Sequence, residues 1–239
     1  MEQNYPRNNF NDAIKGVAVL LMIFFHLCFD LNLYGLIKVD ILNHPFWYFL
    51  PRLIVFLFFF SVGFSLLTVH HSKIKWSLFF RRQLKLFVLS LLISVITYVT
   101  FPQNWIYFGT LHCIFFNSFL LLFFCLKPEK TKYLALILGL LLFIMSALFK
   151  IDLPFFKLDH ASFDYISPFP WIGASLLGLF CKEWLDHLSN KSFPLGHIFH
   201  QNHHFMLGLT YLGRHSLLIY LGHQLVLMSL VYIIKKLIF

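Results

Sequence analysis

Long apolar stretches separated by short polar loops run through almost the whole chain. Each stretch holds about 17 to 25 residues, and about 20 apolar residues in a helix cross the hydrocarbon core of a bilayer. We therefore expect an all-α integral membrane protein, a bundle of about seven transmembrane helices in a single domain over residues 1–239. The expected spans are about 13 to 36, 46 to 69, 83 to 100, 107 to 126, 133 to 149, 167 to 184 and 211 to 234.

Positively charged side chains gather in the loops that follow the second, fourth and sixth expected spans. Cytoplasmic loops of membrane proteins carry an excess of Lys and Arg, so these loops and the N-terminus are predicted to be cytoplasmic. Lys235 and Lys236 then lie outside, against this rule, which leaves an eighth or re-entrant segment near residues 195 to 210 open. The basic loop residues are Lys73, Lys75, Arg81, Arg82, Lys127, Lys130, Lys132, Lys182 and Lys191.

The composition excludes a soluble domain, because 59% of the 239 residues are hydrophobic and only 12% are charged. A net charge of +9 would suit nucleic acid, but Lys and Arg lie in loops between apolar spans, so the charge sets topology and no nucleic acid is expected. The expected partner is the lipid bilayer, that of the inner (cytoplasmic) membrane if the protein is bacterial.

Ionisable residues inside the first span form a regular stripe. Positions 12, 16, 19, 23, 26 and 30 follow a spacing of four and three residues, which places their side chains on one helix face, toward the bundle. His26 and Asp30 are one turn apart, so the carboxylate would orient the imidazole of a general base. A buried polar pair that joins helices is the alternative. Because ionisable groups at membrane depth are costly and usually functional, we favour catalysis.

Three further candidates stand at the predicted outer ends of spans. Arg52 opens the second span and either pairs with Asp30 or anchors its helix at the membrane interface. His44 lies in the loop before it, and His112 begins the fourth span at a depth like that of His26.

A proline-rich segment leads into the sixth span. Asp164 precedes Pro168, Pro170 and Trp171, and prolines interrupt backbone pairing and free groups that line a cavity. Asp164 is expected either to bind substrate or to be a loop charge.

The last span carries several polar side chains. Ser216, Tyr220 and His223 share a face, Gln224 follows, and Arg214 lies near the cytoplasmic end. Substrate binding and a hydrogen-bond network between helices both account for this pattern.

No metal site is expected. Cysteines have no paired spacing, and no H-E-x-x-H motif accompanies the histidines at 197, 200, 203 and 204. The chain also has no G-x-S-x-G elbow, P-loop or dinucleotide fingerprint.

Several short motifs occur in order along the chain: residues 12–16 (DAIKG), 22–31 (MIFFHLCFDL), 109–112 (GTLH), 168–173 (PFPWIG) and 213–217 (GRHSL), with Gly35 and with His223 before Gln224. Taken together, they resemble the heparan-alpha-glucosaminide N-acetyltransferase catalytic-domain family. The resemblance extends over nearly the whole chain.

The resemblance implies a multi-pass enzyme that moves acetyl from cytoplasmic acetyl-CoA to an amino or hydroxyl group of an extracytoplasmic sugar or glycan. Lys15 stands where the family has arginine, and His26 stands where the lysosomal member has a different polar residue. The catalytic histidine of that member loosely matches His44, so the catalytic assignment is divided between His26 and His44.

These arguments give each candidate a role. The catalytic candidates are His26, Asp30, His44 and His112. The substrate-binding candidates are Arg52, Asp164, Trp171, Tyr220, His223 and Gln224. The cofactor-binding candidates, whose charges suit the phosphates of CoA, are Lys15, Arg81, Arg82 and Arg214. A proton-coupled small-molecule transporter is the alternative function, since intramembrane His and Asp also build proton relays. A structural scaffold is the third reading, and a homodimer is left open.

Overall fold

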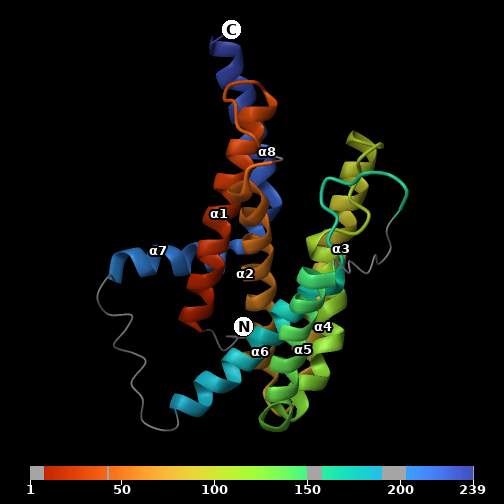
Figure 1. Ribbon diagram of the computed structural model, residues 1–239, viewed down its shortest axis with the longest axis vertical. Coiled ribbons are helices and arrows are strands. Elements are labelled where there is room, and N and C mark those ends of the chain that lie inside the picture. Colours follow the sequence, from red (N-terminus) through yellow and green to blue (C-terminus); the bar gives the residue numbers. More distant parts are fainter. Residues whose placement is uncertain (1–7, 42, 150–157, 190–202, 239) are drawn as a thin grey trace. The chain divides into compact units, whose positions relative to one another are not determined.

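Helices alone make up the secondary structure of the computed structural model over its described residues, 8–41, 43–149, 158–189 and 203–238 (Figure 1). This confirms the all-helical class. The eight helices are α1 (Asn9–Leu33), α2 (Pro45–His70), α3 (Trp76–Thr100), α4 (Thr110–Leu126), α5 (Pro128–Phe149), α6 (Pro168–Ser189), α7 (His203–Arg214) and α8 (Ser216–Ile238).

Five of these helices are long and apolar enough to cross a membrane: α1, α2, α3, α5 and α8. α4 is a shorter apolar helix of 17 residues. Large apolar side chains on the long helices are exposed, among them Val99 at 74% and Leu225 at 72%. Such surface is unfavourable in water and suits contact with lipid tails.

The last expected span is divided in two. α7 ends at Arg214 and α8 begins at Ser216, so the described residues form eight helices, where the sequence predicts about seven transmembrane helices. The described part of α7 begins at His203, and residues 195–202 of the segment that the sequence left open lie outside the described residues.

The third helix begins earlier than expected, at Trp76 rather than near residue 83. Arg81 and Lys85 lie within it as exposed residues. Long basic side chains reach toward the interface while their stems stay along an apolar helix, so a charge does not mark the helix end.

The described helices pack into two compact units, and the division lies inside α2, between Phe58 and Phe59. The terminal unit comprises residues 8–41, 43–58 and 203–238. The central unit comprises residues 59–149 and 158–189.

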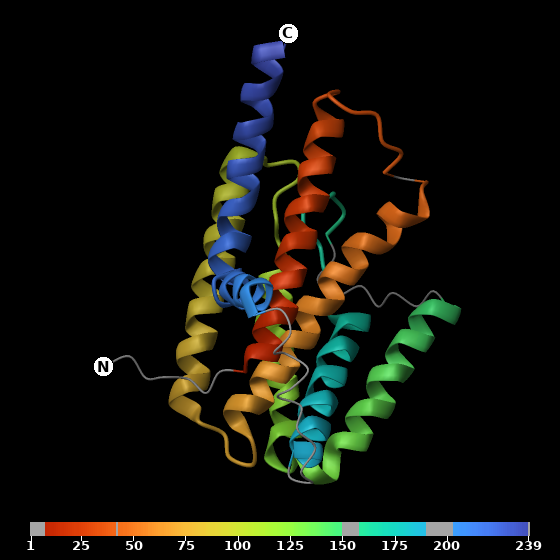
Figure 2. The same ribbon diagram turned by 90° about the vertical axis from the view of Figure 1, so that its left-hand side faces the viewer.

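In the terminal unit α1 packs against both α7 and α8, and α7 lies across α1 (Figures 1 and 2). Two glycines permit this crossing. A Cβ atom on Gly16 would lie 2.1 Å from the carbonyl oxygen of Leu209, and one on Gly213 would lie 1.7 Å from that of Asp12. Backbones this close leave no room for a side chain, which explains both glycines of the sequence motifs physically.

In the central unit α5 and α6 lie side by side, as Figure 2 shows, and α4 contacts α3, α5 and α6. The second half of α2 approaches α6 closely. A Cβ atom on Gly63 would lie 1.8 Å from the carbonyl oxygen of Ser175, and Ser175 Oγ donates a hydrogen bond of 2.8 Å to the carbonyl of Phe59. This packing holds the second half of α2 against the first half of α6.

Candidate active site

The polar stripe expected on the first helix faces the interior of the terminal unit, as the periodicity predicts. Asp12, Val19 and Asp30 are buried, with 6%, 0% and 1% exposure. Gly16 is also buried, while Ile23 and His26 are half-buried. The helix period therefore identified the face that carries the candidate chemistry.

Asp30 is bound by Gln224 of α8. The side-chain Nε2 of Gln224 donates to Oδ1 of Asp30 at 3.0 Å and to Oδ2 at 3.2 Å. The other amide atom of Gln224, Oε1, is buried without a hydrogen-bond partner in the described residues. A carboxylate at 1% exposure is costly in an apolar surrounding, and this amide supplies part of its lost hydration.

His26 and His223 lie against each other, with ring centroids 4.8 Å apart and planes inclined by 65°. His223 Nδ1 is 2.8 Å from the carbonyl oxygen of Tyr220. A carbonyl only accepts, so Nδ1 carries the hydrogen and a neutral His223 has its lone pair on Nε2. In this tautomer the lone pair on Nε2 is the one that accepts a proton in general-base catalysis.

The structure thus brings together five sequence candidates from α1 and α8: His26, Asp30, Tyr220, His223 and Gln224. The sequence expected Asp30 to orient His26. Instead, the carboxylate oxygens of Asp30 accept hydrogen bonds from Gln224, and the imidazole ring beside His26 is that of His223.

The expected pair of Arg52 and Asp30 is wrong. Arg52 is exposed, its Nη1 donates to the Tyr48 carbonyl at 2.7 Å, and its guanidinium carbon lies 3.5 Å from the Tyr48 ring centroid. Arginine stacks well on aromatic faces, so a partner one turn away in its own helix is easier to reach. Arg52 therefore fits the anchoring role that the sequence left open.

His44 is an exposed residue in the loop before α2. Its Nδ1 accepts a hydrogen bond of 3.2 Å from the backbone N–H of Phe46, so a neutral His44 carries its hydrogen on Nε2.

Two of the basic candidates surround Asp12 at the start of α1. Lys15 Nζ donates to Asp12 Oδ1 at 3.3 Å, and Arg214 Nε lies 3.6 Å from Asp12 Oδ2. Arg214 Nη2 also donates to Asn9 Oδ1 at 3.1 Å. The three ionised groups sum to one positive charge, and the side chains of Lys15 and Arg214 are 24% and 41% exposed. These contacts join α7 to α1, and they leave two partly exposed cations that can bind an anion from solution.

In the central unit Asp164 caps the N-terminus of α4. Its Oδ2 accepts from the backbone N–H of Thr110 at 2.9 Å, and its Oδ1 accepts from the Thr110 hydroxyl at 3.1 Å. A Cβ atom on Gly109 would lie 2.6 Å from Asp164 Oδ2, so glycine leaves the space that the carboxylate occupies. A carboxylate is stabilised at this end of the helix dipole.

His112 has both ring nitrogens engaged. Nδ1 accepts from the Gly109 N–H at 3.2 Å, which places the hydrogen of a neutral ring on Nε2. Nε2 then donates to Ser94 Oγ at 3.2 Å, and that hydroxyl donates to the Ile106 carbonyl at 2.6 Å. These contacts give His112 a structural role; its place in catalysis stays a prediction.

The remaining central candidates stand apart from this cap. Trp171 is half-buried, with its ring 6.2 Å from that of Phe143, and follows a kink where Phe169 has φ −103° and ψ 127° ahead of a proline. Arg82 Nη1 donates to Ser118 Oγ at 3.2 Å, and Arg81 is exposed.

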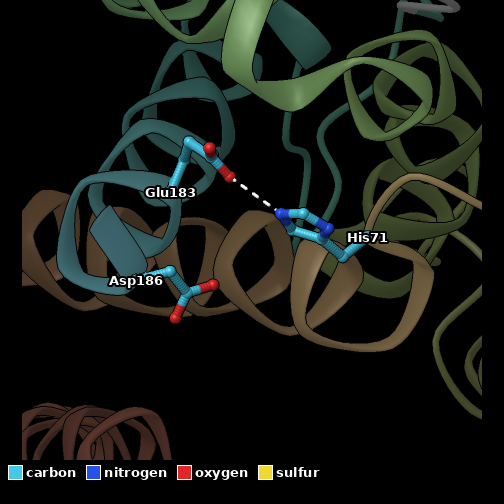
Figure 3. Close-up of side chains that lie close together, drawn as sticks. All are labelled: His71, Glu183 and Asp186. Atoms are coloured by element: carbon cyan, nitrogen blue, oxygen red, sulfur yellow. Dashed lines mark hydrogen bonds and ion pairs between the residues drawn. The ribbon is translucent and has the colours of Figure 1, made fainter. Parts of the chain in front are cut away.

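One group of polar side chains in the central unit was missed by the sequence reading. His71, Glu183 and Asp186 lie together where α2 and α6 end (Figure 3). His71 and Glu183 are 112 positions apart in the chain, and no local motif joins them. Of the loop histidines, His197 and His200 and the side chain of His203 lie outside the described residues, while His204 is exposed.

Comparison with known proteins places the chain among membrane acetyltransferases. No curated protein and no solved structure matches it. A family model does match, over residues 7–225, and so extends over nearly the whole chain and both units. The chain belongs to the family described as heparan-alpha-glucosaminide N-acetyltransferase, catalytic.

Proposed function

We propose that the protein transfers an acetyl group from cytoplasmic acetyl-CoA to an amino or hydroxyl group of an extracytoplasmic sugar or glycan. Its family supports acetyl transfer. The observation that carries the proposal is the group of His26, Asp30, His223 and Gln224, built from two helices that are long and apolar enough to cross a membrane. Groups this costly in a bilayer are retained mainly for function.

In the proposed reaction, the two histidines transfer the proton and Asp30 stabilises the charge that forms. As the acceptor nitrogen or oxygen attacks the acetyl carbonyl carbon, a new C–N or C–O bond forms and the C–S bond of the thioester breaks. The imidazole pair of His26 and His223 takes the proton of the acceptor and returns it to the CoA thiolate, so CoA leaves as the thiol. Asp30 stabilises the positive charge that this pair holds in between. A histidine that carries the acetyl group itself is the second route, through an acetyl-imidazole.

The basic candidates are assigned to the donor side. Lys15 and Arg214, with their one net positive charge beside Asp12, suit the phosphates of CoA, and so do Arg81 and Arg82 of α3. The positive-inside rule supports a cytoplasmic position for all four and for the N-terminus.

The acceptor is assigned to the outer ends of the helices. Tyr220 contributes from α8, and Arg52 and His44 lie near the start of α2. Within the central unit, Asp164 and Trp171 stay separate predictions for acceptor binding. His44 remains the second candidate for the base.

The test is transfer of labelled acetyl from acetyl-CoA to an amino sugar by purified protein in proteoliposomes. Three variants, His26→Ala, His223→Ala and His44→Ala, are compared. We expect the first two to lose about 100- to 10,000-fold in rate, the usual worth of a general base. Loss in His44→Ala alone would move the base to the loop before α2. Activity unchanged in all three, or uptake of the sugar without modification, would reject the assignment and favour a proton-coupled transporter.

A further inference from the structure

A second cluster of ionisable side chains lies at the polar ends of α2 and α6. His71 Nε2 lies 3.1 Å from Oε2 of Glu183, and one ligand atom of each of His71, Glu183 and Asp186 lies within 4.8 Å of the others (Figure 3). Glu183 is 5% exposed, whereas the side chains of His71 and Asp186 are 39% and 41% exposed. A buried carboxylate thus forms the floor of a group that opens to solvent.

The spacing is near that of ligands on one small cation. Zinc bonds of about 2.0 to 2.2 Å to nitrogen and oxygen, in tetrahedral geometry, separate two ligand atoms by roughly 3.4 Å. His71 and Glu183 need to part by only a few tenths of an ångström from their 3.1 Å. Asp186 has to approach further, which requires its half-exposed side chain to turn away from its ion pair with Lys182.

The second nitrogen of His71 is also held. Nδ1 lies 3.0 Å from the hydroxyl of Ser72. When Nδ1–H donates to that hydroxyl, Nε2 turns a lone pair toward Glu183, which is the tautomer of a metal-bound histidine.

The negative charges of Glu183 and Asp186 can also be balanced without a metal, by a protonated histidine and by a lysine. A protonated His71 pairs with Glu183, and Lys182 forms an ion pair with Asp186. Lys182 thus competes directly with a cation for Asp186. That competition makes the two explanations separable, because a metal gains from removal of Lys182 while the ion-pair network only loses a partner.

We propose that His71, Glu183 and Asp186 bind a divalent transition-metal ion of the zinc class, with water completing the coordination. One imidazole and two carboxylates suit zinc or manganese rather than a thiolate-seeking metal. Three protein ligands and an open position are the pattern of zinc sites that keep a water. The bound metal would hold the turn that follows α2 against α6 within the central unit. This site has no part in the proposed acetyl transfer.

The experiment is calorimetric titration of the purified full-length chain, carrying a tag without histidines, with zinc and separately with manganese. The four loop histidines at 197, 200, 203 and 204 would bind zinc themselves, so each variant is also measured with these four replaced by glutamine. The proposal predicts one saturable site that remains in this background.

The variants give the decisive comparison. His71→Ala and Asp186→Asn should abolish saturable binding, whereas His187→Ala, which removes an exposed imidazole from the same helix, should leave it unchanged. Lys182→Met should bind the metal roughly two- to fivefold more tightly, because the ion pair that holds Asp186 is weak and partly exposed. Unfolding temperature measured without metal shows that each variant folds.

No saturable binding in the glutamine background would overturn the proposal, and so would binding that His71→Ala leaves intact. Weaker or unchanged binding in Lys182→Met would show that Asp186 is not a ligand for which Lys182 competes, and would overturn the three-residue site. None of these outcomes bears on acetyl transfer, which is measured separately.

Discussion

The side-chain amide of Gln224 donates to both carboxylate oxygens of Asp30, at 3.0 and 3.2 Å, from a helix 194 positions away in the chain. This contact joins α1 to α8 beside the paired rings of His26 and His223. It holds a carboxylate of 1% exposure on the same two helices that carry these imidazoles. The contact therefore has two effects: it stabilises the charge of Asp30 and it positions α8 against α1. Substitutions at Asp30 and at Gln224 distinguish the two.

Asp30→Asn is expected to keep the fold and lose activity. The oxygen of the new amide still accepts from Gln224 Nε2, and a turn of the two amides lets its N–H₂ group donate to Gln224 Oε1, which is buried without a partner in the described residues. The thermal unfolding temperature in detergent should therefore stay the same or rise, while acetyl transfer falls at least about tenfold because the negative charge is lost.

Gln224→Leu is the contrasting variant. It leaves a buried carboxylate without its hydrogen-bond donor and should destabilise the protein by roughly 3 kcal/mol or more. Full activity in Asp30→Asn would show that the charge has no catalytic part.

His26→Ala and His223→Ala are expected to act as a unit. If the rings share one proton-transfer task, the double variant should lose little more rate than the worse single variant. Rates of acetyl transfer for the two single variants and the double variant complete the cycle. Losses that multiply would instead indicate two independent roles.

Gly213→Ala should destabilise the crossing of α1 and α7. Its Cβ atom would lie 1.7 Å from the Asp12 carbonyl oxygen, so the helices must move apart, at a cost of about 1 to 3 kcal/mol. Gly208→Ala on the same helix is the matched control, because nothing lies within 4 Å of its added Cβ atom. The control should gain about 0.5 to 1 kcal/mol from helix propensity. Equal unfolding temperatures for the two variants would contradict the close approach.

Asp164→Ala should weaken α4 at its start by about 1 kcal/mol, through loss of the cap on Thr110. Thr110→Val removes only the hydroxyl half of that contact and should cost less. Both are measured as shifts in unfolding temperature in detergent. If Asp164 also binds substrate, Asp164→Ala should in addition raise the KM for the acceptor, whereas Thr110→Val should leave that KM unchanged.

Periodicity was sufficient to predict the face of α1 that carries Asp12, His26 and Asp30, because a helix repeats every 3.6 residues wherever it lies. Pairing across the chain was not accessible in the same way. Charge complementarity suggested Arg52 as the partner of Asp30. In the structure Arg52 instead contacts the carbonyl and the ring of Tyr48, one turn away in its own helix. The carboxylate of Asp30 is bound by the neutral amide of Gln224.

Two further features were not predicted. The break at His215, which separates α7 from α8, falls at the polar residues Arg214, His215 and Ser216 inside the expected span 211 to 234, which was predicted as one helix. The contact of His71 with Glu183 depends on how the ends of α2 and α6 pack, and 112 positions of sequence separate the two residues.

The most direct test of the account supplies labelled acetyl-CoA only outside sealed vesicles and an amino sugar only inside them. Proteoliposomes in which the cytoplasmic side of the protein faces outward should accumulate acetylated sugar in the lumen, and His26→Ala with His223→Ala should abolish it. Movement of unmodified sugar across the membrane, without acetylated product in the lumen, would contradict the account.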